Sequence, residues 1–245
     1  MVVTGSVFPI GDGGVGKTSV AMALAAYSGE KDDLEFVYSL QKTVNMEFEF
    51  VRCNCPLSDE VIMAQMYVPP GQKVDDQGGE IGTFDKIVDT FKFMPNMQNI
   101  STVLLVYKLN DFKTFASLEA WLETALINDL LREFTGVILV GTHLDIGFLE
   151  VAPEQLNHAL DFTRRMINDH LPTWRGHISH TVVSNINGRG IPELRTMIVE
   201  SICIANTIRC TFRGELSATC KECMKEKVGT SEEAAPTPAE GSSTS

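Results

Sequence analysis

The chain has few basic residues for its length. Its 245 residues include 20 lysines and arginines against 32 aspartates and glutamates, which gives a formal net charge of −12. Nucleic acids and anionic lipid surfaces attract proteins that present a basic face. This shortage of positive charge argues against broad binding to nucleic acid. It still allows a local phosphate site, which needs only a few backbone N–H groups and one lysine.

Long hydrophobic runs and a signal peptide are also missing. No stretch approaches the roughly 18 uninterrupted apolar residues that a membrane span requires. The N-terminal segment lacks the basic and then apolar layout of a signal peptide, because the first lysine is Lys17. We therefore expect a cytoplasmic protein, and a peripheral position at a membrane stays open.

Cysteine is scarce, since six residues are too few for a disulfide scaffold in a chain of this size. Without an export signal, we expect reduced thiols. The four cysteines nearest the C-terminus are candidate zinc ligands or palmitoylation sites. The favoured alternative places Cys203 in the core of the last helix and the others as free thiols in a tail. These four are Cys203, Cys210, Cys220 and Cys223, and no C-a-a-X prenylation signal follows them.

Short apolar runs alternate with helical patterns over the first two hundred residues. This alternation predicts an α/β fold, with a mostly parallel six-stranded sheet and helices on both faces. The expected strands are Ser6–Ile10, Asn45–Cys53, Val61–Tyr67, Thr102–Tyr107, Gly136–Val140 and His180–Ser184. The expected helices are Lys17–Tyr27, Thr114–Phe134, Pro153–His170 and Pro192–Ala205. Pro9 has no N–H for a strand ladder, so we expect an irregular end to the first strand.

The folded domain is expected to span residues 1–205, followed by a cysteine-containing tail over residues 206–245. Gly229–Ser245 consists of Gly, Ser, Thr, Glu, Ala and Pro, which cannot bury enough apolar surface to fold. Inside the domain, Pro69–Asn99 is rich in Gly, Asp and Gln and is longer than most connections. Such a segment is usually functional or disordered.

The strongest motif is Gly11-Asp12-Gly13-Gly14-Val15-Gly16-Lys17-Thr18, which matches G-x-x-x-x-G-K-[ST] between an expected strand and an expected helix. Glycines let the loop wrap with its backbone N–H groups pointing inward at phosphate oxygens. The helix that follows presents its positive end to the same anion. Lys17 is placed to reach the β and γ phosphates, and the Thr18 hydroxyl to ligate Mg²⁺.

A glycine-rich turn without a ligand is the competing interpretation of this motif. The order of strand, loop and helix favours a nucleoside phosphate site. The residues expected to contact the phosphates are Asp12, Gly13, Gly14, Val15, Gly16, Lys17, Thr18 and Ser19.

A second motif, Val140-Gly141-Thr142-His143-Leu144-Asp145, follows another apolar run. Together with the phosphate loop it resembles the Ras-superfamily small GTPases, a branch of the P-loop NTPases. The resemblance covers roughly residues 5–205 and assigns no subfamily. It implies that Asp145 reads guanine, accepting hydrogen bonds from N1–H and the 2-amino group, a pair of donors that adenine lacks.

This base motif departs from the N-K-x-D pattern of the family. Thr142 stands in place of Asn and can still make one side-chain hydrogen bond. His143 replaces the Lys whose methylene stem packs over the base. The competing interpretation, in which Asp145 only caps a loop, stays open.

A third segment, Val183-Ser184-Asn185-Ile186, resembles the family's S-A-K loop, and a glycine-containing turn and a helix follow it. The resemblance implies that backbone N–H groups after Ser184 contact the guanine O6. Asn185 and Ile186 replace Ala and Lys, so only the backbone role carries over. A plain strand-to-helix connection is the alternative.

Thr43 resembles the switch threonine that precedes the family's second strand. The resemblance implies that its hydroxyl binds Mg²⁺ and its N–H binds the γ-phosphate, in the triphosphate state only. Phe36 lies where the family often places an aromatic residue against the base. Thr43 could equally be an ordinary strand residue, because β-branched side chains favour strands.

The D-x-x-G element is incomplete. Met66-Tyr67-Val68-Pro69-Pro70-Gly71-Gln72 resembles the family's W-D-x-x-G-Q, with Val68 in place of the Asp that holds Mg²⁺ through water. The resemblance implies that Gly71 donates its N–H to the γ-phosphate and that Gln72 orients the attacking water. A second alignment uses Asp75 or Asp76, which do not directly follow a strand.

The resemblance leads to two hypotheses. In the first, the chain binds GTP and GDP with Mg²⁺, hydrolyses GTP slowly through Gln72 and Lys17, and signals through effector proteins. An exchange factor and a GTPase-activating protein are then expected as regulators. In the second, it is a non-hydrolysing scaffold of the same fold, because Val68, Pro69 and Pro70 alter the catalytic loop. An ATP-dependent enzyme is disfavoured by Asp145.

Overall fold

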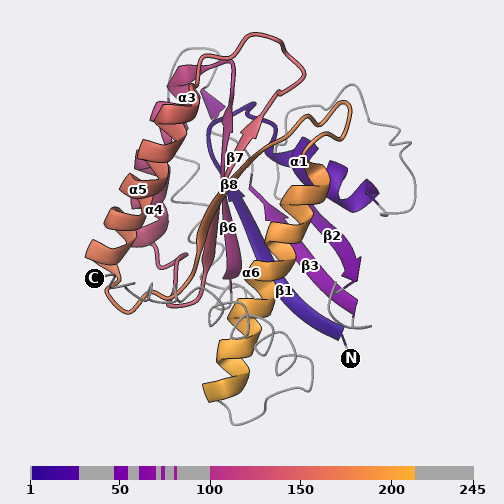
Figure 1. Ribbon diagram of the computed structural model, residues 1–245, viewed down its shortest axis with the longest axis vertical. Helices are drawn as coiled ribbons and strands as arrows, with labels where there is room; N and C mark the ends of the chain where they lie inside the picture. Colours follow the sequence, from indigo (N-terminus) through magenta and orange to yellow (C-terminus); the bar gives the residue numbers. More distant parts are fainter. Residues whose placement is uncertain are drawn as a thin grey trace, which may run out of the picture.

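A six-stranded sheet forms the centre of the protein in the computed structural model, which describes residues 2–27, 47–54, 61–69, 73–74, 80–81 and 100–212 (Figure 1). The strand order is β2-β3-β1-β6-β7-β8, and only β2 runs antiparallel to its neighbour. The sheet strands are β1 (Val2–Ile10), β2 (Glu47–Asn54), β3 (Val61–Val68), β6 (Ile100–Lys108), β7 (Gly136–Thr142) and β8 (Ile178–Val182). Separately, β4 (Lys73–Val74) and β5 (Glu80–Ile81) form a two-stranded antiparallel pair. The predicted sheet is confirmed.

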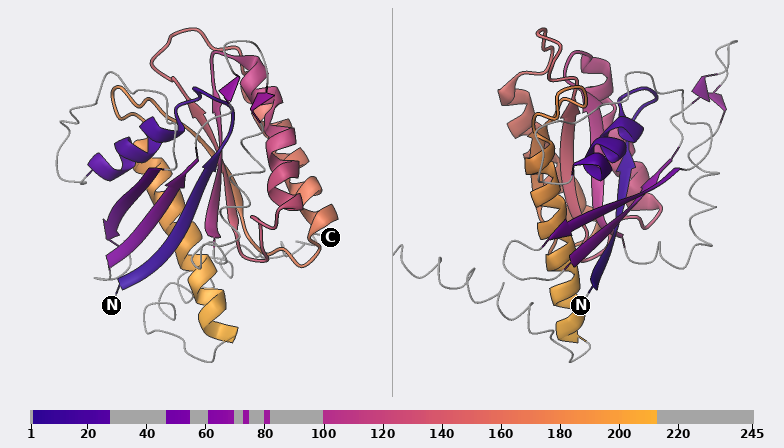
Figure 2. Two further views of the ribbon diagram at one scale, coloured as in Figure 1. Left: turned by 180° about the vertical axis from the view of Figure 1, so that it is seen from behind. Right: turned by 90° about the vertical axis from the view of Figure 1, so that its right-hand side faces the viewer.

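Helices cover both faces of the sheet, as expected (Figure 2). On one face lie α1 (Lys17–Ala26) and α6 (Ile191–Phe212), which contact each other. The other face carries α3 (Phe112–Ala116), α4 (Leu118–Ile127) and α5 (Pro153–His170).

Alternating side chains divide the core into two layers. In β1, Val7 packs with the layer under α1 and α6, whereas its neighbour Phe8 packs with the layer under α4 and α5. Both side chains are fully buried. Because successive residues of a strand point to opposite faces, a strand covered by helices on both sides must be apolar throughout. The unbroken apolar runs of β6 and β7 have this cause.

The prediction of a single helix over Thr114–Phe134 is wrong, because α3 and α4 lie there as two shorter helices. Ser117 ends α3 and begins α4. At the other end, Asp129 adopts a φ of 55°. The N–H groups of Asp129 and Leu130 then bond to the carbonyls of Leu126 and Ala125, at 3.1 and 2.9 Å. This is a Schellman turn with Asp in the position usually held by Gly, so no glycine marked the end of the helix.

Three smaller expectations also need correction. Helix α6 continues seven residues beyond the expected end at Ala205, to Phe212. The last strand ends at Val182, because the Ser184 N–H bonds to the Arg189 carbonyl inside the following turn. The irregularity in β1 lies between Ser6 and Val7 on the side facing β6, and β1 pairs with β3 only as far as Val7. Pro9 therefore lies in the part of β1 that pairs with β6 alone, so the N–H that proline lacks breaks no hydrogen bond to β3.

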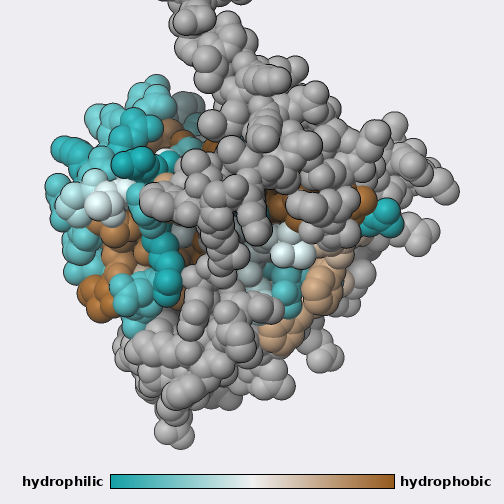
Figure 3. All heavy atoms as spheres, turned by 90° about the horizontal axis from the view of Figure 1, so that it is seen from below, coloured by the Kyte–Doolittle hydropathy of each residue, from teal (hydrophilic) through white to brown (hydrophobic). Residues whose placement is uncertain are grey.

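The outer faces of the helices are polar. In α5 the buried residues are Leu156, Thr163 and Ile167, all on one stripe, and the remaining positions are charged or polar for the most part. Seen from below, the surface on the side of α4 and α5 is largely hydrophilic with apolar patches between (Figure 3). No helix among the described residues is long and apolar enough to span a membrane. Residues 213–245, most of the predicted tail, lie outside the described residues, so the domain boundary stays a prediction.

Close packing between β1 and α6 gives a test of the fold. A Cβ added to Gly5 would lie 2.8 and 2.9 Å from Cγ2 and Cδ1 of Ile202. Gly5→Ala should therefore lower the free energy of unfolding by about 1–3 kcal/mol, measured by urea denaturation. Ile202→Ala should largely remove the clash, so that the double variant is more stable than the sum of the two single changes predicts. Gly147→Ala is the control, because a Cβ there meets no atom within 4 Å. Equal losses for Gly5→Ala and Gly147→Ala would contradict this packing.

Candidate functional site

The loop from Gly11 to Gly16 connects β1 to α1 with a backbone that requires glycine. Gly14 and Gly16 have φ values of 77° and 92°, in the left-handed region that other residues avoid. At Gly11 the reason is space, because a Cβ there would overlap the backbone carbonyl of Val106 on β6. The sequence pattern therefore folds into the wrapped loop that was predicted from it.

Lys17 is held with its ammonium group over this loop. Its Nζ donates to the carbonyls of Gly11 at 2.8 Å and Asp12 at 2.7 Å. An ammonium has three N–H donors, and the third has no acceptor among the described residues. Burial lowers the pKa of Lys17 to about 8, and the negative charge of Asp12 opposes this shift. The loop thus holds an oriented cation that an anion would stabilise.

The first turn of α1 adds backbone donors to the same place. Gly16 is the N-cap and makes no side-chain cap, and the first turn contains no acidic residue. The first turn therefore supplies no carboxylate of its own to neutralise the positive end of the helix. Thr18 and Ser19, both half-buried, lie in this turn beside Lys17. The arrangement fits a phosphate group.

Thr142 connects this loop to the second predicted motif. It is fully buried at the end of β7, and its Oγ1 lies 2.8 Å from the Val15 carbonyl and 2.9 Å from the Tyr107 carbonyl. A hydroxyl has one proton, so it donates to one of these carbonyls at a time. This contact brings the base motif against the phosphate loop, across 127 residues of sequence.

His143 follows in a left-handed conformation, with a φ of 63°. Its Nδ1 lies 2.8 Å from the Thr142 Oγ1. When that hydroxyl donates to a carbonyl, it accepts from the Nδ1–H tautomer of His143, which leaves Nε2 as an acceptor. Burial lowers the pKa of His143, the positive charge of Lys108 lowers it further, and Asp145 opposes both. The imidazole is therefore neutral near pH 7.

Asp145 and Ser184, which follow the neighbouring strands β7 and β8, are joined by a hydrogen bond. The Ser184 Oγ donates to Asp145 Oδ1 at 2.7 Å, and it accepts from the N–H groups of Ile186 and Asn187 at 3.3 Å each. Ser184 is fully buried, whereas Asp145 is exposed. The serine therefore fixes the orientation of a carboxylate that faces solvent.

The side chain of Asn185 also reaches this site, although the sequence suggested only a backbone role for it. Its Nδ2 lies 3.2 Å from the place where a Cβ on Gly16 would be. Its Oδ1 is buried and has no hydrogen-bond partner in the described part of the chain. A buried, unpaired amide oxygen is unfavourable unless a ligand or water supplies a donor. The only sign of a side-chain role in the sequence is that Asn185 stands where the family has Ala.

Several predicted residues cannot be placed. Phe36, Thr43, Gly71 and Gln72 lie outside the described residues, as do Asp75 and Asp76. Val68 is described, and it is fully buried at the end of β3 within the apolar layer under α1 and α6. The position expected for the D-x-x-G aspartate therefore supplies no oxygen ligand.

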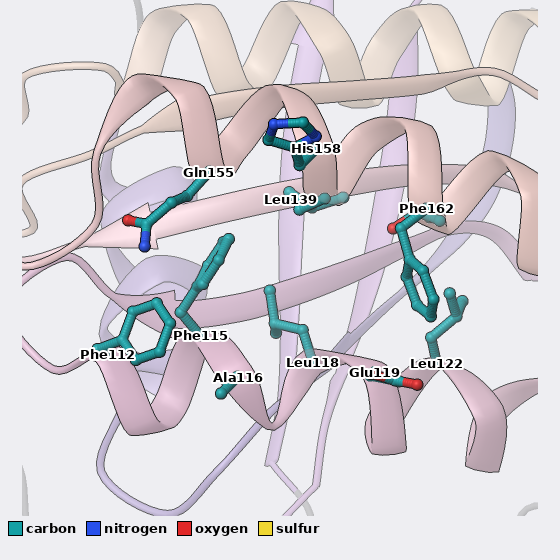
Figure 4. Close-up of a pocket in the computed structure, with 12 residues that line it drawn as sticks. Phe112, Phe115, Ala116, Leu118, Glu119, Leu122, Leu139, Gln155, His158 and Phe162 are labelled. Atoms are coloured by element: carbon teal, nitrogen blue, oxygen red, sulfur yellow. The ribbon is translucent and has the colours of Figure 1, made fainter.

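Among the described residues, no group of three or more His, Cys, Asp or Glu side chains is arranged to hold a metal ion. A groove of about 310 Å³ lies between α3–α4 and α5 (Figure 4). Its lining is mainly apolar and includes Phe112, Phe115, Leu122 and Phe162. Its polar lining residues are Glu119, Gln155, His158 and Thr163.

Comparison with known proteins identifies a family. The model of the Ras family matches residues 7–160, which is more than half of the chain and includes both the phosphate loop and Asp145. Ser184, Asn185 and Ile186 lie beyond the matched range. No curated protein matches the sequence.

The lowered pKa of Lys17 predicts how phosphate binding depends on pH. Lys17 loses its charge above about pH 8, and a bound anion favours the charged form, so affinity must fall as pH rises through this value. Affinity for a nucleoside triphosphate with Mg²⁺ should be roughly tenfold weaker at pH 9 than at pH 7.5. Titration with a fluorescent nucleotide measures this, and constant affinity over this range would contradict the placement of Lys17.

Proposed function

The chain belongs to the Ras family, and from this we propose that it is a molecular switch that binds GTP and GDP with Mg²⁺ and hydrolyses GTP slowly. The contact between Thr142 Oγ1 and the Val15 carbonyl carries the proposal, since it joins a phosphate loop and a base loop into one site. A turn without a ligand would need no second loop fixed against it.

The phosphate end of the proposed site consists of backbone donors and one cation. Two of the three N–H donors of Lys17 bind loop carbonyls, and the third would bind the β and γ phosphates. Thr18 from α1 and, by family resemblance, Thr43 would hold the metal. When bound, Mg²⁺ neutralises charge on the phosphate oxygens. Phe36 would lie against the base and Gly71 would donate to the γ-phosphate.

The base end is proposed to read guanine. Asp145 is oriented by Ser184, and a carboxylate in this place accepts from the N1–H and 2-amino groups of guanine. The Thr142 hydroxyl donates to protein carbonyls, so its direct contact with the base stays a prediction. His143, Asn185 and Ile186 would complete this end of the site.

Hydrolysis would depend on the residues that follow β3 in the sequence. Gln72 would orient the attacking water, as in the family. Val68 supports the alternative of a non-hydrolysing scaffold, because its fully buried side chain contributes no oxygen. Pro69 and Pro70 add stiffness to the segment that must move, since proline fixes its own φ.

Partner proteins would recognise the nucleotide state. The regions expected to change are Lys42–Asn45 and Pro69–Asn99, through loss of contacts with the γ-phosphate. Effectors, an exchange factor and a GTPase-activating protein are the proposed partners, without nucleic acid. We propose a cytoplasmic site of action, with a peripheral membrane position as the alternative.

Base recognition can be tested by changing the chemistry of Asp145. Asp145→Asn should lose GTP affinity and gain affinity for xanthosine triphosphate, whose 2-oxo group accepts from the new amide. A change of roughly 10²-fold in the ratio of the two affinities is expected, because two charged hydrogen bonds are exchanged. Competition against a fluorescent nucleotide measures the ratio. Asp161→Asn, exposed on α5, is the control, and an unchanged ratio in Asp145→Asn would remove its role in reading the base.

Phosphate release separates the switch from the scaffold. The full chain loaded with GTP and Mg²⁺ should release phosphate in a single turnover, faster than GTP in buffer. Gln72→Leu should slow this release at least tenfold without weakening GTP binding, since the variant loses only the group that orients water. Release at the buffer rate by the unchanged protein would favour the scaffold.

A further inference from the structure

The carboxylate of Asp12 is bound by two residues that lie more than a hundred positions away in the sequence. Asp12 Oδ2 lies 2.7 Å from the Ser117 Oγ, and Oδ1 accepts from the Trp121 Nε1 at 2.7 Å. The single Ser117 hydroxyl proton can also reach the Thr114 carbonyl at 3.0 Å, and the shorter distance and the charge favour Asp12. Hydrogen bonds to a carboxylate are roughly twice as strong as those between neutral groups. Both oxygens of a half-buried charge are therefore satisfied from outside the loop.

Both donors come from one rigid place. Ser117 joins α3 to α4, and Trp121 lies one turn further along α4, where only 8% of its surface is exposed. The Trp121 backbone N–H also bonds to the Ser117 carbonyl, at 3.1 Å. Leu118 and Leu122, next to these two residues, pack in the core layer under α4 and α5. The carboxylate is thus attached to a helix fixed by core packing.

A carboxylate in a loop that binds phosphates needs an explanation, because like charges repel. The two donors hold this charge against α4, while the carbonyl of the same residue accepts from Lys17. Without Ser117 and Trp121, the carboxylate would lose hydrogen bonds or would turn toward other donors. The donors nearest to it in the chain are Lys17 and the N–H groups of the loop. Either change would disturb the loop that the proposed function requires.

We propose that Asp12 is a positioning residue that anchors the phosphate loop to α4, so that nucleotide affinity depends on Ser117 and Trp121. Neither of these residues is expected to touch the nucleotide. The expected change in GTP affinity rests on the proposed function. The expected change in the conformation of the loop does not, because it can be observed without nucleotide.

Trp121→Phe is the most direct variant, because it keeps an aromatic ring and removes the N–H donor. The control is Trp174→Phe, the same change at the other tryptophan, whose Nε1 donates to the Thr135 carbonyl at 2.9 Å, away from the loop. Ser117→Ala is a second variant, which removes the other donor. Amide spectra of the full chain without added nucleotide report on the loop through Gly13, Gly14 and Gly16. Titration with fluorescent GTP and Mg²⁺ reports affinity.

Trp121→Phe and Ser117→Ala should shift the amide signals of the three glycines and weaken GTP binding roughly tenfold each. Trp174→Phe should do neither. Asp12→Asn should move the indole N–H signal of Trp121 but not that of Trp174. In an Asp12→Ala background, Trp121→Phe should have no further effect on affinity, which a general loss of stability would not reproduce.

Unshifted glycine signals in Trp121→Phe and Ser117→Ala would overturn the inference, and so would shifted signals with unchanged GTP affinity. If the unchanged protein binds no nucleotide while its glycine signals still respond to Trp121→Phe, the anchor of the loop is supported and the proposed function is contradicted. The two failures are thus distinguishable.

Discussion

The site depends on one buried ammonium group. Lys17 lies 6% exposed with its Nζ between the carbonyls of Gly11 and Asp12. Burying a charge is unfavourable unless partners replace its water, and two neutral carbonyls replace it only in part. The lowered pKa expresses this deficit. An anion in the loop would remove the deficit, which is why the loop, the helix end and the lysine make physical sense together as a polyanion site.

The topology of the sheet gathers the remaining parts around this lysine. In parallel strands, the carboxyl ends share one edge, and ligands of open α/β sheets bind there. The phosphate loop follows β1, the Thr142 motif ends β7, and Ser184 follows β8. Thr142 contacts the phosphate loop through the Val15 carbonyl, and Ser184 binds Asp145. The buried hydroxyl groups of Thr142 and Ser184 thus connect three loops, although both side chains are short.

The sequence predicted the parts of this arrangement that depend on local chemistry. Apolar runs gave the strands, and the glycines and Lys17 gave the phosphate loop. The resemblance implied that Asp145 and the backbone after Ser184 both contact guanine, and the structure joins the two side chains by a hydrogen bond. The features that the sequence did not predict depend on contacts between distant residues or on unusual turn residues. Nothing near Asp12 in the sequence indicates that Ser117 and Trp121 bind its carboxylate, because that contact spans 105 and 109 residues. Asp129 ends α4 in a turn where glycine is the usual signal.

Binding and catalysis depend on different parts of this chain, because the phosphate loop follows β1, whereas the segment expected to act in hydrolysis follows β3. Val68 is part of the core, so the family's metal-linked aspartate has no equivalent at that position. Nucleotide binding itself can be measured by calorimetric titration of the full chain with GTP and Mg²⁺. One nucleotide should bind per chain, and Lys17→Ala should lose this binding. No heat with any guanosine or adenosine di- or triphosphate would contradict the proposed nucleotide binding.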